Sequence, residues 1–438
     1  MLLDRQKIVW VCGLVAIAFL NQVIAGVNYE EAPIHYRKTK PNNAISKLQS
    51  QMESGEVKLE YDSKFGYLPS LLEHLKVTPS SQVMPFAKIS RQNPKIGPQT
   101  PRAIYFNDEI HIGYVQDGLI EIAVTDPLLG MVFYTLEQNE VDRPVFRNDS
   151  ASCLTCHGTS KTKNVPGLQV RSVVPDAKGE PVLAAGSFRS DHSSPIEKRW
   201  GGWYVTGKHG TQKHLGNLVL PDQSKPKSLD NPDGQNLTSL DRFFDTSKYL
   251  QNTSDIVALM VLEHQADTLN IITTANFETR YAQYLLELES QKPNADKAKL
   301  ESDKQNRLKK AGDKLLTYLL FQNETKLSEP LQGVSSFSKD FENAGKKDRL
   351  GRSLRDFDLQ TRIFKYPCSY LIYSNAFQSL PDDMKHYVLQ QLAAIIRGEV
   401  TDKAYEHLSE MDRKVIGEIL LETHPEFATA WNRAGQRP

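Results

Sequence analysis

The residues best suited to chemistry form one short run near the middle of the chain. Cys153 and Cys156 are separated by two residues, and His157 follows directly. At this spacing two thiols can add across the two vinyl groups of a haem, while the next residue presents an imidazole to the iron from one face. The run therefore predicts one covalently bound haem c, attached through Cys153 and Cys156, with His157 as the proximal ligand of the iron.

A C-x-x-C pair has other uses, which the sequence leaves open. A zinc site needs four ligands, and Cys368 is the only other cysteine outside the first 25 residues. A thioredoxin-like redox pair is expected beside a βαβ pattern, which does not surround this run. A structural disulfide would have to close a very tight loop. Covalent haem is favoured over these three, and the apolar, aromatic setting of Cys368 predicts a buried core thiol.

Residues 1–25 have the order of a secretory signal peptide. Arg5 and Lys7 precede an apolar run from Ile8 to Leu20, and Val23-Ile24-Ala25 offers a cleavage site. The run is shorter than the roughly 20 residues of a bilayer-spanning helix. We expect a cleaved leader, with an uncleaved anchor as the alternative. The mature protein is then exported, periplasmic and without a membrane span, in a compartment where covalent haem attachment takes place.

The composition excludes several classes of partner. The 438 residues include 53 Lys+Arg and 53 Asp+Glu, so the net charge is zero and no overall field attracts nucleic acid. A hydrophobic fraction of 39% is enough for a buried core, and four cysteines are too few for a scaffold built on disulfides. We expect no nucleic-acid partner, and a redox partner protein that the sequence does not identify.

Strand and turn signals surround the pentapeptide. Runs rich in Ile, Val, Tyr and Phe, separated by Asp- and Asn-containing turns, cover Ile104 to Tyr114, Leu119 to Thr125 and Gly130 to Leu136. Leu168 to Val174 and Pro181 to Gly186 flank a further turn and predict a hairpin. Residues 101–220 are therefore expected to form a haem c-binding, β-rich domain.

The two flanking regions have different patterns. Residues 26–100 are polar and are expected to wrap the surface, with one short helix at Tyr67 to Leu75. Residues 221–236 are rich in turn signals and predict a linker, after which residues 237–438 are expected to form a helical domain. Its first helix, Asp255 to Ala266, is apolar nearly all round and predicted to be buried. Further helices are expected at 277–288, 306–321 and 381–398. The predicted fold class is α+β.

With its pentapeptide and leader, the chain resembles c-type cytochromes. The resemblance covers the attachment motif and implies electron transfer, with the iron cycling between Fe(III) and Fe(II). Small class I cytochromes place an axial Met some tens of residues after the motif, whereas here the next Met after Cys156 is Met260. The strand–turn–strand stretch Arg171 to Gly186 is similar to the hairpin of PAS or Cache domains, which implies a PAS- or Cache-like haem unit.

Other residues are candidates for completing the haem site. A metal-bound histidine usually donates its second ring nitrogen to a carbonyl or carboxylate, and the backbone near Val165 and Pro166 is close enough in sequence to accept. His264 is the distal candidate on the apolar helix. The alternatives are Met260, His192, His209 and His214, or an open position. Candidates for holding the haem propionates are Arg147, Arg171, Arg189, Arg199, Trp200, Trp203 and Tyr204.

Three functions fit these expectations. The first is an exported monohaem electron carrier. The second is a haem-based redox or gas sensor, which would differ by a weakly ligated iron that binds CO or NO. The third is a peroxidase-like haem enzyme, which is disfavoured because bacterial c-type peroxidases usually carry two attachment motifs and this chain has one.

Overall fold

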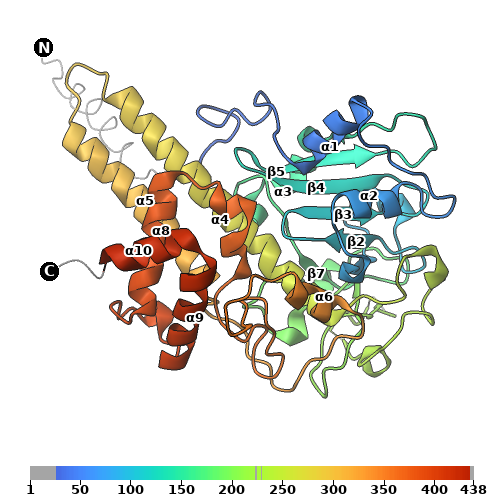
Figure 1. Ribbon diagram of the computed structural model, residues 1–438. Coiled ribbons are helices and arrows are strands. Elements are labelled where there is room, and N and C mark those ends of the chain that lie inside the picture. Colours follow the sequence, from blue (N-terminus) through green and yellow to red (C-terminus); the bar gives the residue numbers. More distant parts are fainter. Residues whose placement is uncertain (1–25, 222–223, 228, 435–438) are drawn as a thin grey trace, which may run out of the picture.

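The computed structural model describes residues 26–221, 224–227 and 229–434. The predicted signal peptide at residues 1–25 lies outside the described residues. The fold is α+β, with an antiparallel sheet in the N-terminal half and a helical C-terminal region, as Figure 1 shows. This confirms the fold class predicted from the sequence.

The central sheet has five strands that pair in chain order. They are β2 (Ala103–Phe106), β3 (Ile110–Tyr114), β4 (Ile120–Asp126), β5 (Gly130–Leu136) and β6 (Arg147–Asn148). Successive side chains of a strand point to opposite faces, and the register sets Phe106 opposite His111, His111 opposite Ala123, and Ala123 opposite Phe133. These four residues therefore form one row across a single face of the sheet.

Two N-terminal helices pack against the sheet. They are α1 (Ala44–Glu53) and α2 (Leu68–His74), and the second confirms the helix predicted near Tyr67. Asn43 begins α1 with a capping box that it shares with Ser46. Leu48 and Leu71 belong to the same buried cluster as the sheet residues. The N-terminal region thus contributes to the core and does more than wrap the surface.

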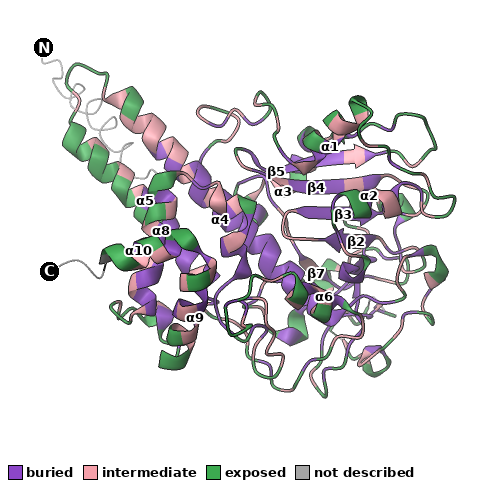
Figure 2. Ribbon diagram, in the orientation of Figure 1, coloured by how far each residue is buried: buried purple, intermediate pink, exposed green. Residues whose placement is uncertain are grey.

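A 34-residue helix, α4 (Ile256–Glu289), connects the two halves of the molecule. Asp255 caps its first turn by accepting a hydrogen bond from the backbone of Val257. The helix is buried on all sides through most of its length (Figure 2), as its apolar composition predicts. The segments 255–266 and 277–288, predicted as separate helices, are parts of this one helix. Its residue Leu269 lies in the sheet cluster, and Leu259 lies in the helical cluster.

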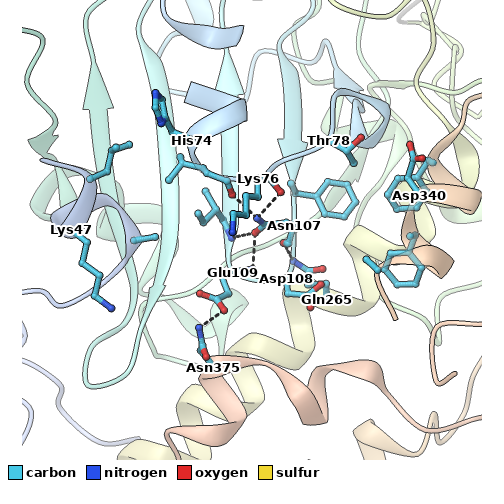
Figure 3. Close-up of a pocket in the computed structure, with 18 of the residues that line it drawn as sticks. Lys47, His74, Lys76, Thr78, Asn107, Asp108, Glu109, Gln265, Asp340 and Asn375 are labelled. Atoms are coloured by element: carbon cyan, nitrogen blue, oxygen red, sulfur yellow. Dashed lines mark hydrogen bonds between the residues drawn. The ribbon is translucent and has the colours of Figure 1, made fainter. Parts of the chain in front are cut away.

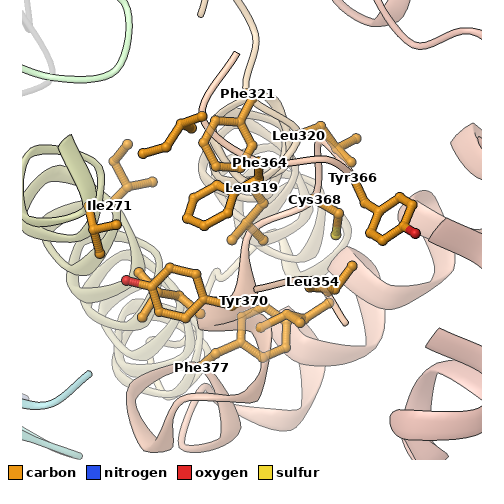
Figure 4. Close-up of a cluster of buried hydrophobic side chains, with 14 of the residues drawn as sticks. Ile271, Leu319, Leu320, Phe321, Leu354, Phe364, Tyr366, Cys368, Tyr370 and Phe377 are labelled. Atoms are coloured by element: carbon orange, nitrogen blue, oxygen red, sulfur yellow. The ribbon is translucent and has the colours of Figure 1, made fainter. Parts of the chain in front are cut away.

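The remaining helices form the C-terminal region. They are α5 (Lys297–Leu319), α6 (Phe337–Asn343), α7 (Asn375–Gln378), α8 (Asp382–Ile396), α9 (Glu410–Thr423) and α10 (Pro425–Ala434). Their core includes Cys368, which is completely buried among leucine and aromatic side chains (Figure 4). Its complete burial confirms the predicted buried core thiol, and burial raises the pKa of the Cys368 thiol to about 12. None of the described helices is both long and apolar enough to cross a bilayer.

The hairpin after the pentapeptide differs from its prediction. β7 (Arg171–Val173) pairs with β8 (Ser187–Arg189), and residues Leu183–Ala185 of the predicted second strand form a 3₁₀ turn. The hairpin that carried the resemblance to PAS and Cache domains is a separate two-stranded sheet, outside the central one. A second short pair, β1 (Met84–Pro85) with β9 (Trp203–Tyr204), ties the N-terminal region to the segment before the predicted linker.

Candidate haem-attachment site

The pentapeptide forms the C-terminal part of a short helix, α3 (Ser150–His157). The helix is fixed to the sheet because the backbone N–H of Phe133 donates to the Ser150 hydroxyl at 3.1 Å and Leu154 is buried in the sheet cluster. Cys153 and Cys156 are three residues apart and so lie on neighbouring positions of one helix face. The first thiol is half-buried and the second is exposed, and both are free.

The His157 ring is held by one backbone carbonyl. Nδ1 lies 2.9 Å from the carbonyl oxygen of Gly167, and the Gly167 N–H donates back to the His157 carbonyl at 2.9 Å. The sequence predicts a carbonyl acceptor near Pro166, and the acceptor is the next residue, while the Pro166 carbonyl accepts from Met131. Because a carbonyl can only accept, Nδ1 carries the proton and the Nε2 lone pair is free.

The surroundings of His157 favour its neutral form. Burial lowers the pKa of the imidazole, against the opposing effect of the hydrogen bond to Gly167, and the Arg102 guanidinium lowers it further. The ring packs against Phe133 at a centroid distance of 5.0 Å. Among the described residues, Nε2 has no hydrogen-bond partner. A neutral imidazole with an unpaired Nε2 is the form that binds iron.

The loop of residues 158–168, called the motif loop here, is fixed by α4. Asn270 makes two hydrogen bonds to Leu168, accepting from its N–H at 2.8 Å and donating to its carbonyl at 2.7 Å. Gly167 is required at this contact, because a Cβ there would lie 2.1 Å from Oδ1 of Asn270. One turn earlier on the helix, Asp267 forms an ion pair with Lys163 at 3.1 Å. The helix therefore sets the position of the carbonyl that holds His157.

Two arginines that the sequence did not single out lie beside the pentapeptide. Arg102 pairs with Glu121 at 3.1 Å, and its guanidinium lies over Gly113, where a Cβ would be only 2.3 Å from Nη2. The buried Nε of Arg102 has no partner among the described residues. Arg91 pairs with Asp149 next to Cys153. Burial raises the pKa of the Cys153 thiol to about 11. The free Nε2, the two thiols and the unpaired Nε of Arg102 form a set that fits a covalently bound haem.

His264, the distal candidate, has both ring nitrogens occupied. Its Nδ1 lies 2.9 Å from Nδ1 of His192, and its Nε2 lies 2.8 Å from the Ser369 hydroxyl. The ring is completely buried and stacks on Phe321 at 4.2 Å. The structure thus pairs His264 with His192 inside the core and does not bring it against His157.

The other distal candidates are also internal. His209 accepts from the backbone N–H of Asn236 at 2.9 Å, and His214 accepts from that of Gly216 at 3.0 Å. Their rings lie 4.7 Å apart, away from His157. Met260 is buried in the helical cluster. Within the described ranges, no other histidine ring contacts that of His157.

Most of the predicted propionate-binding residues have structural roles. Arg199 is completely buried and pairs with Glu263 at 2.9 Å. The ring nitrogen of Trp203 donates to a backbone carbonyl, as does the Tyr204 hydroxyl. The glycines after Trp200 let this segment pack closely against the backbone of Val173, because a Cβ on Gly201 would lie 3.1 Å from the main chain of Val173. Of the others, Arg147 pairs with Glu137, Arg171 donates to Ser187 and Arg189 pairs with Asp267.

No family model, no curated protein and no solved structure matches this chain. Within the described part of the chain, no group of three or more His, Cys, Asp or Glu side chains is arranged to hold a metal ion. The support for a function therefore comes from the residues and geometry of the chain itself.

Proposed function

We propose that the chain is an exported, monohaem c-type cytochrome that carries haem on Cys153 and Cys156 and transfers electrons to or from a partner protein. The observation that carries the proposal is the hydrogen bond from Nδ1 of His157 to the Gly167 carbonyl. It selects the tautomer in which Nε2 is free, as a proximal haem ligand requires. The pentapeptide alone would be compatible with an unoriented histidine, so this contact adds independent support.

Bound haem would supply one-electron chemistry at its iron, and the chain would set how readily the iron accepts an electron. The Gly167 carbonyl makes the imidazole a stronger donor, which favours the oxidised state. Arg102 supplies a positive charge and Glu121 a negative charge close to His157. The Nε of Arg102 is a cationic donor suited to a haem carboxylate.

The direct test is expression of the full chain together with a haem-attachment system, followed by intact mass and visible spectra. Wild-type protein is expected to gain the mass of one haem that stays attached after denaturation. C153A/C156A is expected to carry none. C368A is the matched control, since its thiol is buried elsewhere, and should carry haem normally. A wild-type chain without added mass, or one whose colour is removed by acidified organic solvent, overturns the proposal.

A haem-based gas or redox sensor is the second candidate. It is favoured by the absence of any described histidine ring next to His157 and by the internal pairing of His264. CO added to the reduced protein distinguishes the two functions. A shifted spectrum supports a weakly ligated iron and the sensor, whereas an unchanged spectrum supports a six-coordinate electron carrier. A peroxidase-like activity would appear as turnover of peroxide with an electron donor.

A further inference from the structure

A cavity of about 780 Å³ lies at the turn between β2 and β3, apart from the haem-attachment site (Figure 3). Three parts of the chain meet there. Helix α1 and residues 74–78 form one wall, the turn from Asn107 to Ile110 forms the middle, and α4 and α6 form the far side. A cavity of this size is typical of sites for small organic ligands.

Within the described residues, the floor of the cavity offers a ligand no free hydrogen-bonding groups. Phe106, Phe337 and Phe341 line it, with ring centroids 5.8 Å apart for the first two and 5.6 Å for the last two. Gln265 also lies there, but its amide is fully used. Its Oε1 accepts from Tyr370 at 2.8 Å, and its Nε2 donates to the Asn107 carbonyl at 2.6 Å. Each ring is less than a tenth exposed, so a ligand body at this depth contacts only small parts of the rings together with the rest of the apolar lining, and it needs no hydrogen bonds.

The acidic residues of the lining already have partners in the chain. Asp108 forms an ion pair with Arg355. Asp340 accepts from the hydroxyl of Ser80 at 2.7 Å and of Ser336 at 2.8 Å. Glu109, the third acid, accepts from the side-chain amide of Asn375. Asp108 is thus neutralised by an ion pair, whereas Asp340 and Glu109 keep their negative charge because their partners are neutral groups.

Of the three Lys and Arg residues of the lining, Arg355 pairs with Asp108, whereas the two lysines have no such partner in the described chain. Lys47 and Lys76 are exposed, and no described residue forms an ion pair or a side-chain hydrogen bond with either ammonium group. Figure 3 shows Lys47 and Asp340 on opposite sides of the cavity. The positive charge that is free to meet a ligand thus lies on the α1 side, above a floor made of aromatic rings.

We propose that this cavity binds a small aromatic carboxylate. Its ring system packs against Phe106, Phe337 and Phe341, and its carboxylate lies toward Lys47 and Lys76. Apolar burial supplies most of the affinity, and the two lysines select an anion over a neutral molecule of the same shape. The site is independent of the haem proposal because none of its lining residues belongs to the pentapeptide or the motif loop.

The probe for this site is 2-naphthoate, titrated by calorimetry into the full chain at low salt. K47Q/K76Q is expected to weaken its binding at least about fivefold, the effect of losing two exposed ion pairs. F341L, which keeps the apolar volume but removes a ring, should also weaken it. K292Q is the matched control, because Lys292 is exposed and pairs with Glu289 far from the cavity. 2-Naphthalenemethanol, the neutral analogue, should bind more weakly than 2-naphthoate.

Three results would overturn the proposal. They are no binding of 2-naphthoate to the wild-type chain, equal binding to K47Q/K76Q, and equal affinity for the neutral analogue. The same titration is repeated on C153A/C156A, which should keep wild-type affinity. A chain that carries no haem but binds 2-naphthoate therefore overturns only the proposal of a cytochrome. A chain that carries haem but does not bind 2-naphthoate overturns only the proposal of a ligand site.

Discussion

At the scale of single residues, His157 is the group on which the proposed chemistry depends. Its Nδ1 is hydrogen-bonded to the Gly167 carbonyl, and its Nε2 has no partner in the part of the chain that the structure describes. The neutral ring is favoured by burial, which lowers the pKa of His157. One residue thus combines an orientation, a tautomer and a protonation state that all suit iron binding.

His157→Gly separates covalent attachment from iron ligation. Both thiols remain, so the variant is expected to keep the mass of one haem, while its visible spectrum changes because the proximal nitrogen is lost. Free imidazole should restore a spectrum close to that of the wild type. His386→Gly, at an exposed position near Arg433, is the control and should leave the spectrum unchanged. A wild-type spectrum for His157→Gly without imidazole would exclude His157 as ligand.

His214 should make the fold sensitive to acid. Burial, reinforced by the neighbouring His209, lowers its pKa from 6.5 to about 3. The unfolded chain therefore binds a proton in this range that the folded chain does not, so stability is present above pH 6.5 and is lost as the pH falls toward 3. The loss from this residue is about 1.4 kcal/mol per pH unit.

Urea unfolding measured between pH 7 and pH 4 tests this dependence. His214→Asn keeps an acceptor for the Gly216 N–H but does not titrate, and its free energy of unfolding should fall less steeply as the pH is lowered. Parallel pH profiles for wild type and His214→Asn would contradict the assignment.

At the scale of elements, α4 positions His157, the proposed haem ligand, through the motif loop. Asn270 holds both polar groups of the Leu168 backbone, and Leu168 follows the carbonyl that accepts from His157. Asp267 fixes the same loop through Lys163. Residues far apart in sequence thus determine the orientation of the ring.

Asn270→Leu tests this support. The change leaves the N–H and carbonyl of Leu168 without partners, which should lower the free energy of unfolding by about 1–3 kcal/mol. It should also shift the reduction potential of the bound haem, since the Gly167 carbonyl is no longer fixed. Gln283→Ala, near the far end of the same helix, is the control and should change neither quantity appreciably. An unchanged reduction potential in Asn270→Leu would contradict the claim that α4 influences the proposed haem site through Asn270.

The sequence predicts those parts of the site that are local. Alternating apolar residues give the strands β3 to β5, and five consecutive residues give the attachment motif. Arg102 could not be found in this way, because only the pairing of β2 with β3 and the missing side chain of Gly113 bring it to the site. Asn270 could not be found either, because it lies 102 residues from its partner. The predicted strand at 181–186 failed because the pairing partner of β7 begins at Ser187.

At the scale of the whole molecule, the two halves share their core. The helical cluster includes Val83, Trp200 and Val205 from before the predicted linker, together with the C-terminal helices. The sheet cluster includes Leu269 and Phe277 from α4. The region that contains the pentapeptide and the helical region therefore stabilise each other.

Unfolding should accordingly be a single transition. In urea, haem absorbance reports the region around the pentapeptide, and far-ultraviolet circular dichroism reports mainly the helices. The two midpoints are expected to coincide, because α4 cannot leave one cluster without exposing the other. Two separated midpoints would show that the halves are independent.

The contact between Asn270 and Leu168 also bears on the order in which the parts of the site form during export. A chain that is exported from its N-terminus delivers the pentapeptide first, and the residue that immobilises the following loop arrives 102 residues later. During that interval His157 is not yet fixed by its final contacts, and in the proposed cytochrome the thiols could receive haem before the ring is oriented. Docking of the late helix then fixes the motif loop and the His157 ring, so the proposed function would place haem attachment before this step of folding.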